Sequence, residues 1–491
     1  MFWLALLLAV APLLAAQSAT LGEESNQATA LMAAGRYAEA IPLYQALAKS
    51  LPTNPGIVAD LGVALHMAGR EQEAVSQLRK ALRLDPQNVG AKLYLGYAYL
   101  SLGKPAAALP FLEAAARAGP ANTDASENLG EALYAVGRFH AAAERFERLS
   151  QATPEDAEVW YRLGLCYQQL SQASFAELQK TAYGSAWWLA LVAESNAKAG
   201  KYASAFYLYH QALAKMPAFP GAHAGLAKIY SATGHAAWAK TEQERERDSP
   251  DCARQSTECA FLAGRYGQIV AAPSRSPEVL YWKSKAYDQL ALAAFLHLTS
   301  LPPSAQLHEL LAETHEKARD YPAAVAEWRK AYDLSQQNPE IGQKLAIALI
   351  ETDDDQGAER LLAKFLAHQP GSADLNYLKG YALLNLQQPA KAIPYFEESL
   401  RLEPLLVKAQ GDLGRAYMQT GQSRKAIPHL EAALKTDQDG SLHYQLARAY
   451  VASGEPKLAA PMFAAYQKLH QASARESEAL KQQIHLAPPP E

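Results

Sequence analysis

Two of the three cysteines, Cys252 and Cys259, have a spacing that indicates chemistry. On one continuous helix their Cα atoms would stand about 10 Å apart, which is too far for a disulfide. A loop around Arg254–Thr257 would bring the thiols within reach, and oxidising surroundings would bond them. The alternative is two ordinary thiols. A metal site is disfavoured because no further cysteine or histidine stands at ligand spacing.

The sequence contains none of the common catalytic motifs. It has no G-x-S-x-G, no phosphate-binding loop, no H-E-x-x-H and no Rossmann fingerprint, and its 13 histidines are scattered. We therefore predict that the protein is not an enzyme, and that it uses no cofactor and no metal.

The elements that position the remaining side chains follow a period of 34 residues. The strings AAGRYAEAIPLY, MAGREQEAVSQL, SLGKPAAALPFL and AVGRFHAAAERF begin 34 residues apart, at Ala33, Met67, Ser101 and Ala135. A fixed period of this length indicates one supersecondary unit stacked on copies of itself. Such a protein is first of all a surface for binding.

Each period predicts two antiparallel helices. Counted from residues 21, 55, 89 and 123, the eighth position is small and the twentieth is alanine, as at Gly96 and Ala108, so that the two helices can approach closely. Glycine at position 15 suits the turn between the helices, and proline at position 32 stops the second helix. A further proline at position 22 falls near the start of the second helix, where we expect its missing N–H to cost little. This proline recurs at Pro42, Pro110, Pro394, Pro428 and Pro461.

These spaced positions resemble the tetratricopeptide repeat, and the resemblance covers nearly all of the chain after its N-terminal segment. It implies an all-α, right-handed superhelical solenoid of stacked antiparallel helix pairs, with about a dozen units, two of them atypical. It also implies a concave groove that is lined by the first helices and commonly holds proteins or peptides.

The resemblance places positions 2, 5, 9 and 12 of each unit on the concave side. The lysine and asparagine with which some family members clamp a chaperone tail do not match here, which disfavours that role. Tyrosines at these positions can be rigid anchors for a partner, or half-buried packing residues. The groove candidates are Tyr97, Glu131, Tyr161, Tyr377, Tyr381, Arg415, Tyr444 and Arg448.

Arg415 and Arg448 occupy position 9 of adjacent units, with Tyr444 beside them. An arginine pair of this kind suits a carboxylate or an acidic segment of a partner, through fork-like hydrogen bonds. The alternative is that Asp412, one helical turn before Arg415, neutralises it in an ordinary ion pair.

One block in the middle of the chain occurs twice and breaks the period. EVWYRLGLCYQQLSQASFAEL at Glu158 matches EVLYWKSKAYDQLALAAFLHL at Glu278. We expect a longer or bent helix at Trp160–Leu178 and at Leu280–Leu298, with Tyr161/Tyr281 and Phe175/Phe295 as repeated aromatic residues. The duplication is either inherited packing or a paired feature of the groove. Between the copies, residues 250–276 look like a collapsed unit and predict a joint between two solenoid halves.

The N-terminus indicates export. Phe2–Ala16 is an unbroken apolar run of signal-peptide length, with small residues for cleavage near Ala16 or Ala19; the alternative is a retained anchor. Elsewhere no stretch is long and apolar enough to span a bilayer. With 49% hydrophobic and 20% charged residues the chain is globular, and its net charge of −4 disfavours nucleic acid as a partner.

Together these features predict five parts: a signal peptide at 1–19, an N-terminal solenoid at 20–249, the joint at 250–276, a C-terminal solenoid at 277–470 and a helix end with a Pro-rich tail at 471–491. We expect an exported protein, periplasmic or secreted, that binds other proteins or peptides as a scaffold of the cell envelope, with no membrane span once the signal is removed. The first alternative is an accessory factor for polysaccharide or protein export that binds carbohydrate. An enzyme is the less favoured alternative.

Overall fold

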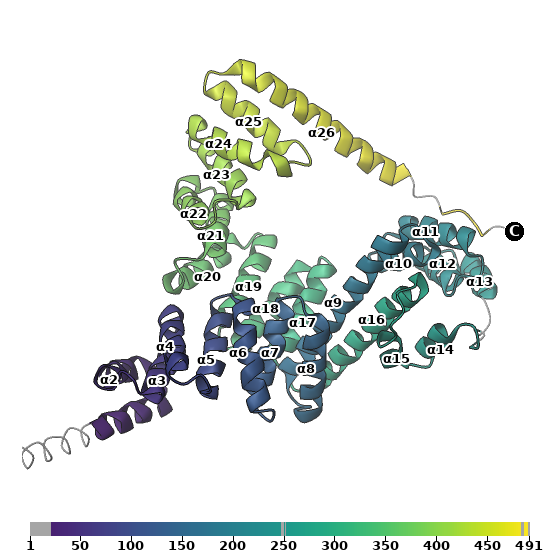
Figure 1. Cartoon of the computed structure of the whole chain (residues 1–491). Helices are drawn as coiled ribbons and strands as arrows, with labels where there is room; N and C mark the ends of the chain where they lie inside the picture. The colour runs from purple at the N-terminus through teal and green to yellow at the C-terminus, as the bar shows by residue number, and fades with distance from the viewer. Residues whose placement is uncertain (1–20, 247–249, 251, 483–485, 490–491) are drawn as a thin grey trace, which may run out of the picture. The chain divides into compact units, whose positions relative to one another are not determined.

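The structure is a computed structural model that describes residues 21–246, 250, 252–482 and 486–489, except for the side chains of 473–482. Within these ranges the regular elements are all helices, which confirms the predicted fold class (Figure 1). The predicted signal peptide at 1–19 lies outside the described residues.

Residues 21–33 are helical. The labelled elements that follow are α2 (Tyr37–Ser50), α3 (Pro55–Met67), α4 (Glu71–Leu84), α5 (Val89–Ser101), α6 (Pro105–Ala118), α7 (Thr123–Ala135), α8 (Phe139–Ala152), α9 (Ala157–Ala182), α10 (Ala186–Lys198), α11 (Tyr202–Lys215), α12 (Ala222–Ala232), α13 (Ala236–Arg245), α14 (Ser256–Leu262), α15 (Tyr266–Val270), α16 (Pro277–Ser300), α17 (Ala305–Lys317), α18 (Tyr321–Leu334), α19 (Pro339–Glu351), α20 (Asp355–His368), α21 (Ala373–Asn385), α22 (Pro389–Leu402), α23 (Val407–Gln419), α24 (Ser423–Ala433), the 3₁₀ helix η1 (Leu434–Thr436), α25 (Ser441–Ala452) and α26 (Pro456–Gln482).

Each regular unit is a pair of antiparallel helices that pack on each other and on the next unit. The two helices of a pair share the most extensive contacts, as in α3 with α4 and α21 with α22. First helices of neighbouring units also contact one another, as α3 does α5 and α23 does α25. These contacts place the first helices on the inner side of the stack, as the resemblance implied.

Local sequence explains where the helices begin and turn. The side chains of Asn88 and Asn122 accept the N–H groups of Ala91 and Ala125, both at 2.8 Å, and thereby cap α5 and α7. The predicted glycine turns are confirmed, for example at Gly103, whose φ of 65° favours glycine. Where a unit lacks this glycine, another residue adopts the left-handed conformation, as Gln387 does with φ 58°.

The predicted seam of small residues is also present. A Cβ atom on Gly96 would lie 2.5 Å from Cγ and Cδ2 of Leu112, closer than side chains pack. Ala108, on the facing helix, is completely buried. The small residues therefore set the distance between the two helices of a unit.

The expectation for the prolines at position 22 is wrong in one respect. Pro42 is the sixth residue of α2 and Pro110 the sixth of α6, and both helices continue for eight more residues. Only the first four N–H groups of a helix lack an internal partner, so a proline at the sixth position removes one hydrogen bond of the helix. Each of these helices therefore forms one internal hydrogen bond fewer than its length allows.

The duplicated block forms two long helices, α9 and α16, as predicted, and the two pack against each other (Figure 1). The ring of Trp160 lies 4.0 Å from that of His297, and the ring of Tyr167 lies 6.2 Å from that of Tyr287. Near the other end of the contact, the hydroxyl of Ser171 donates to the carbonyl oxygen of Ser284 at 3.0 Å. As residue numbers rise along α9, the partners on α16 fall, so the helices are antiparallel.

The α9–α16 pair has an approximate two-fold relation. Tyr167 and Tyr287 occupy the same place in the two copies, 120 residues apart in sequence, and they contact each other. When two equivalent helices pack antiparallel, a residue that contacts its own counterpart lies at the two-fold axis that relates the two helices. The duplication therefore serves the packing of two copies against each other.

The chain divides into two compact units. One contains residues 1–176, 260–273 and 282–297, and the other contains residues 177–259, 274–281 and 298–491. The expected joint at 250–276 is thus itself divided between them. Separate buried clusters within the second unit run from Ala305 to Ala382 and from Leu383 to Ala459.

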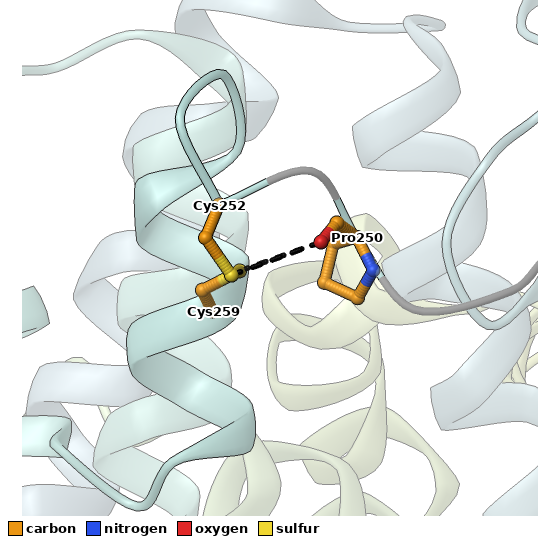
Figure 2. Close-up of a disulfide and its surroundings, with 3 residues drawn as sticks. All are labelled: Pro250, Cys252 and Cys259. Carbon is orange, nitrogen blue, oxygen red and sulfur yellow. Dashed lines mark hydrogen bonds between the residues drawn. A yellow bond between two sulfur atoms is a disulfide. The ribbon is translucent and has the colours of Figure 1, made fainter.

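The segment that was expected to be a collapsed unit holds a disulfide between Cys252 and Cys259, with the Cα atoms 5.6 Å apart (Figure 2). Cys252 lies in a turn and Cys259 in α14, so the chain does bend between them. The sulfur atom of Cys252 lies 3.7 Å from the carbonyl oxygen of Pro250. Because the bonded sulfur carries no proton, this contact is a close approach without a hydrogen bond.

Candidate binding site in the C-terminal repeats

Three of the groove candidates, Arg415, Tyr444 and Arg448, line one cavity of about 500 Å³. Arg415 comes from α23, and Tyr444 and Arg448 lie one turn apart on α25. The cavity is completed by residues of α23, the turn before α25, α25 itself and α26, namely Met418, Gln419, Asp439, Ser441, Gln445, Tyr466 and His470.

The turn that leads into α25 is fixed by two aspartates. The carboxylate of Asp437 accepts the N–H groups of Gly440 at 3.0 Å and His443 at 2.8 Å. Asp439 accepts the N–H of Ser441 at 2.9 Å, and this backbone hydrogen bond lowers the pKa of its carboxyl group. These bonds satisfy donors at the start of α25 and hold the helix that carries Tyr444 and Arg448.

Gly440 is required for two independent reasons. Its φ of 88° lies in the left-handed region. In addition, a Cβ atom here would lie 2.9 Å from Cδ2 of Tyr466 and 3.0 Å from its backbone. Gly440 therefore lets α26 approach α25, which brings the Tyr466 ring to 5.2 Å from the Tyr444 ring.

The two arginines differ in their electrostatic surroundings. Arg415 donates to the carboxylate of Asp412 at 2.8 Å, so the ion pair considered as an alternative is present. Asp412 also accepts the hydroxyl of Tyr377 at 3.1 Å; burial raises the pKa of Asp412, and Arg415 opposes that rise. Arg448 is exposed, its guanidinium lies 6.0 Å from the Tyr444 ring, and it forms no ion pair within the described part of the chain. Arg448 is therefore the cation that remains available to a ligand.

Tyr377 and Tyr381 lie next to this site. Their rings are 6.0 Å apart, and Tyr377 is anchored by its hydrogen bond to Asp412. Burial, with Asp412 adding to it, raises the pKa of Tyr377 well above its usual range. Tyr377 thus serves as support for Asp412 and Arg415, whereas neither tyrosine lines the cavity.

The remaining candidates, Tyr97, Glu131 and Tyr161, belong to the other compact unit. Tyr97 is half-buried, 5.6 Å from the ring of Tyr94, and burial raises its pKa to about 12. Glu131 lies 3.7 Å from the guanidinium of Arg162. Tyr161 is only 4% exposed, because this part of α9 faces α16 and Phe295. Its assignment to an open groove is therefore corrected: it is a packing residue.

The contribution of α26 was not predicted from the sequence, because only first-helix positions were expected in the groove. Tyr466 and His470 reach the cavity from the second helix of the last unit, with their rings 5.4 Å apart. Gly440 was the only hint in the sequence, since a glycine before α25 permits close packing of another helix. That the other helix is α26 becomes evident only in the structure. Among the described residues, no group of three His, Cys, Asp or Glu side chains could hold a metal ion.

The stacked pairs and the cavity on their C-terminal members define a helical-repeat protein that presents surfaces for binding. Models of the tetratricopeptide repeat match residues 25–89 and 344–405, and also 65–126, 99–166, 197–242 and 383–444, together more than half of the chain. The chain belongs to the tetratricopeptide repeat family. Members of this family generally bind other proteins.

Individual relatives match short segments. Tetratricopeptide repeat protein 21B of Xenopus laevis is 30% identical over 20% of this chain, and Protein FlbA of Caulobacter vibrioides is 31% identical over 23%. The chain spans only 7% and 20% of the length of these two proteins. Among solved structures, a crystal structure of MamA protein matches 38% of this chain and 98% of its own, with 20% identity and a TM-score of 0.31. Scores this low carry no functional conclusion.

Proposed function

We propose that the protein is a scaffold of the cell envelope that captures an acidic polypeptide segment of a partner in the cavity between α23, α25 and α26. The observation that carries this proposal is the unpaired, exposed Arg448 beside Arg415, Tyr444 and Tyr466 in one cavity. Arginine binds a carboxylate with two parallel hydrogen bonds, and tyrosines supply rigid contact area. Gln419 and Gln445 offer amide groups to a peptide backbone.

The test uses the purified full-length protein on an array of acidic, neutral and basic peptides. Wild type should prefer acidic peptides, and Arg448→Ala should weaken that binding by about tenfold, as expected for the loss of a charged hydrogen bond. Arg424→Ala on α24 is the matched control, because Arg424 is exposed and lies outside the cavity. Binding of acidic peptides that does not change in Arg448→Ala would rule the cavity out.

A second candidate is carbohydrate binding, which fits an accessory role in polymer export. It is favoured by the two tyrosine rings and by Asp439 and Gln445, which could hydrogen-bond sugar hydroxyls in the same cavity. A glycan array probed with the same proteins separates the candidates. Glycan binding that is lost in Tyr466→Ala, together with no preference for acidic peptides, would favour this one.

The envelope location rests on the apolar run at Phe2–Ala16. Within the described residues no helix is long and apolar enough to cross a membrane. We expect N-terminal sequencing of protein from the host envelope to show cleavage near Ala16 or Ala19. An intact Met1 on a membrane-bound product would contradict this part of the proposal and leave the binding test unaffected.

A further inference from the structure

One buried lysine departs from the repeat pattern. The seventh residue of the first helix is leucine in α3, α5, α7, α9, α19 and α23, and each of these leucines is at most 4% exposed. In α21 the same place holds Lys379, which is only 3% exposed. Lys283 takes this place in α16 but is half-buried. Lys379 is the only fully buried lysine or arginine in the described residues.

The partner of Lys379 departs from the pattern as well. Its Nζ donates to Oε1 of Glu359 at 2.5 Å and to the Glu359 carbonyl oxygen at 3.0 Å. Glu359 is the fifth residue of α20. The fifth residue of the second helix is apolar in most other units, as at Val75, Val325 and Ile393. An ion pair has thus replaced an apolar pair at one junction of the stack.

Stability does not explain this replacement. Taking the Lys379 ammonium group out of water is costly, and its partner Glu359 keeps 31% of its side chain exposed. Replacing an ion pair with a buried member by apolar residues often leaves stability unchanged or raises it. The neighbouring units show that the fold accepts apolar residues at both places, for example Leu413 with Ile393. The pair therefore calls for a reason other than the packing of the repeat.

The surroundings of Lys379 supply that reason. Lys379 and Glu359 line a cavity of about 670 Å³ whose wall comes from α20, α21 and α22. Arg360 and Lys391 also line it, both are exposed, and neither forms an ion pair in the described ranges. Three cations thus face the cavity, against one carboxylate, that of Glu359.

Neutral groups add further donors. Gln356 and Gln388 line the cavity with their amides. The Tyr395 ring also lines it, 5.8 Å from Nζ of Lys379. The cavity lies between two second helices, and its residues are separate from those around Arg448. It is therefore a different site from the one described above.

We propose that the cavity between α20 and α22 is an anion-binding site, with Lys379 at its base and Arg360 and Lys391 beside it, that binds a dianion such as a phosphate monoester or a dicarboxylate. The excess of two positive charges in the lining matches a dianion. Arginine contacts such groups through its planar fork and lysine as a point charge. This site is independent of peptide capture by the C-terminal cavity.

The experiment is isothermal titration calorimetry of the full-length protein with inorganic phosphate and, separately, with succinate. Wild type should bind at least one of them. The double variant Lys379→Leu/Glu359→Ile restores the apolar pair of the other units, so it should fold. It removes one cation and one carboxylate and leaves the excess of two positive charges unchanged. The expected fall in affinity of about tenfold or more therefore reports the loss of Lys379 as a direct donor to the anion. Arg360→Ala and Lys391→Ala should each weaken binding as well, because each removes one cation from an exposed position.

Lys425→Ala is the matched control, because Lys425 is the third residue of α24 as Lys391 is of α22, yet it lies outside the cavity. Its affinity should equal that of wild type. Tighter binding of phosphate would assign a phosphorylated ligand, and tighter binding of succinate a dicarboxylate; both results support the site. The proposal is overturned if wild type binds neither anion, or if the apolar double variant binds as tightly as wild type. Should the double variant fail to fold, unchanged binding by Arg360→Ala and Lys391→Ala would overturn it equally.

Discussion

Replacing Gly414 by alanine should destabilise the C-terminal repeats, whereas the same replacement at Gly411, one turn earlier on α23, should stabilise them. A Cβ atom on Gly414 would lie 2.6 Å from Cγ and 2.7 Å from Cδ2 of Leu430, with the Leu430 backbone nitrogen at 3.4 Å. A Cβ atom on Gly411 would lie 3.5 Å from Ala433 and 3.5 Å from Leu442, which is ordinary contact. The two positions share a helix and differ in the space available.

The magnitudes follow from two opposing contributions. Alanine in place of glycine inside a helix gains about 1 kcal/mol in the free energy of unfolding, at either position. At Gly414 overpacking opposes this gain by about 1–3 kcal/mol. Leu430 is completely buried and cannot turn away, which places the cost in the upper part of that range. We expect Gly414→Ala to lose about 1–2 kcal/mol net and Gly411→Ala to gain about 0.5–1 kcal/mol.

Hydrogen exchange of the full-length protein, read by mass spectrometry on peptides from α23 and α24, is the appropriate assay. Repeat arrays need not unfold in one step, so a local opening free energy is more informative than one global melt. Peptides from α3 and α4 serve as the internal reference. A change of the same sign in both variants would refute the argument, because helix propensity alone would then account for the data.

Three further results are expected. Ala74→Leu should destabilise α3–α4 by about 1–3 kcal/mol through overpacking of the seam. Arg79 is exposed on the same helix, so Arg79→Ala should change stability by less than about 0.5 kcal/mol. Equal effects of the two substitutions in denaturant melts would contradict the repeat register. Mass spectrometry of native protein should show the Cys252–Cys259 peptide gaining the mass of two hydrogen atoms only on reduction, and free alkylation of both thiols without reduction would count against the bond. Burial first, and then nearby carboxylates, raise the pKa of Glu127 from 4.5 to about 7. Its protonated form therefore stabilises the folded state below pH 4.5, and this stability is lost as pH rises through 7. Glu127→Gln should protect α7 from hydrogen exchange at pH 8 but not at pH 4, and equal protection at both pH values would contradict this prediction.

The local parts of the fold could be predicted from the sequence, because the same residue pattern, and with it the same contact, recurs in many repeats. Glycine at position 15 indicated a turn, and Gly103 indeed has a positive φ. Small residues at positions 8 and 20 indicated a close seam, and Gly96 has no room for a Cβ atom. The pairing of α9 with α16 could not be predicted in this way. Duplication revealed that two similar helices exist, but periodicity contains no information on which distant helix each one contacts.

The same distinction between local repeat positions and long-range contacts applies to the candidate sites. Arg415 and Arg448 could be placed together because they occupy equivalent positions of adjacent units. Tyr161 was misassigned because the position that faces the groove in a regular unit faces α16 in α9. Lys379 escaped notice although the signal was present, since comparing the seventh position of the first helices exposes it among leucines. Its burial, and the cavity beside it, required the structure.

The contact between α9 and α16 also affects the order in which the chain can fold. Units of a solenoid touch their sequence neighbours, so most of this protein can fold as it leaves the ribosome. Ser171 and Ser284, however, are 113 residues apart. Closing that loop costs about 1 kcal/mol more in chain entropy than closing a 34-residue unit. At synthesis rates of about 5–20 residues per second, the partner of α9 is completed roughly 6–23 s after α9 itself. During that interval the face of α9 that carries Tyr167 is uncovered, and this one step of folding cannot begin until more than half of the chain has been made.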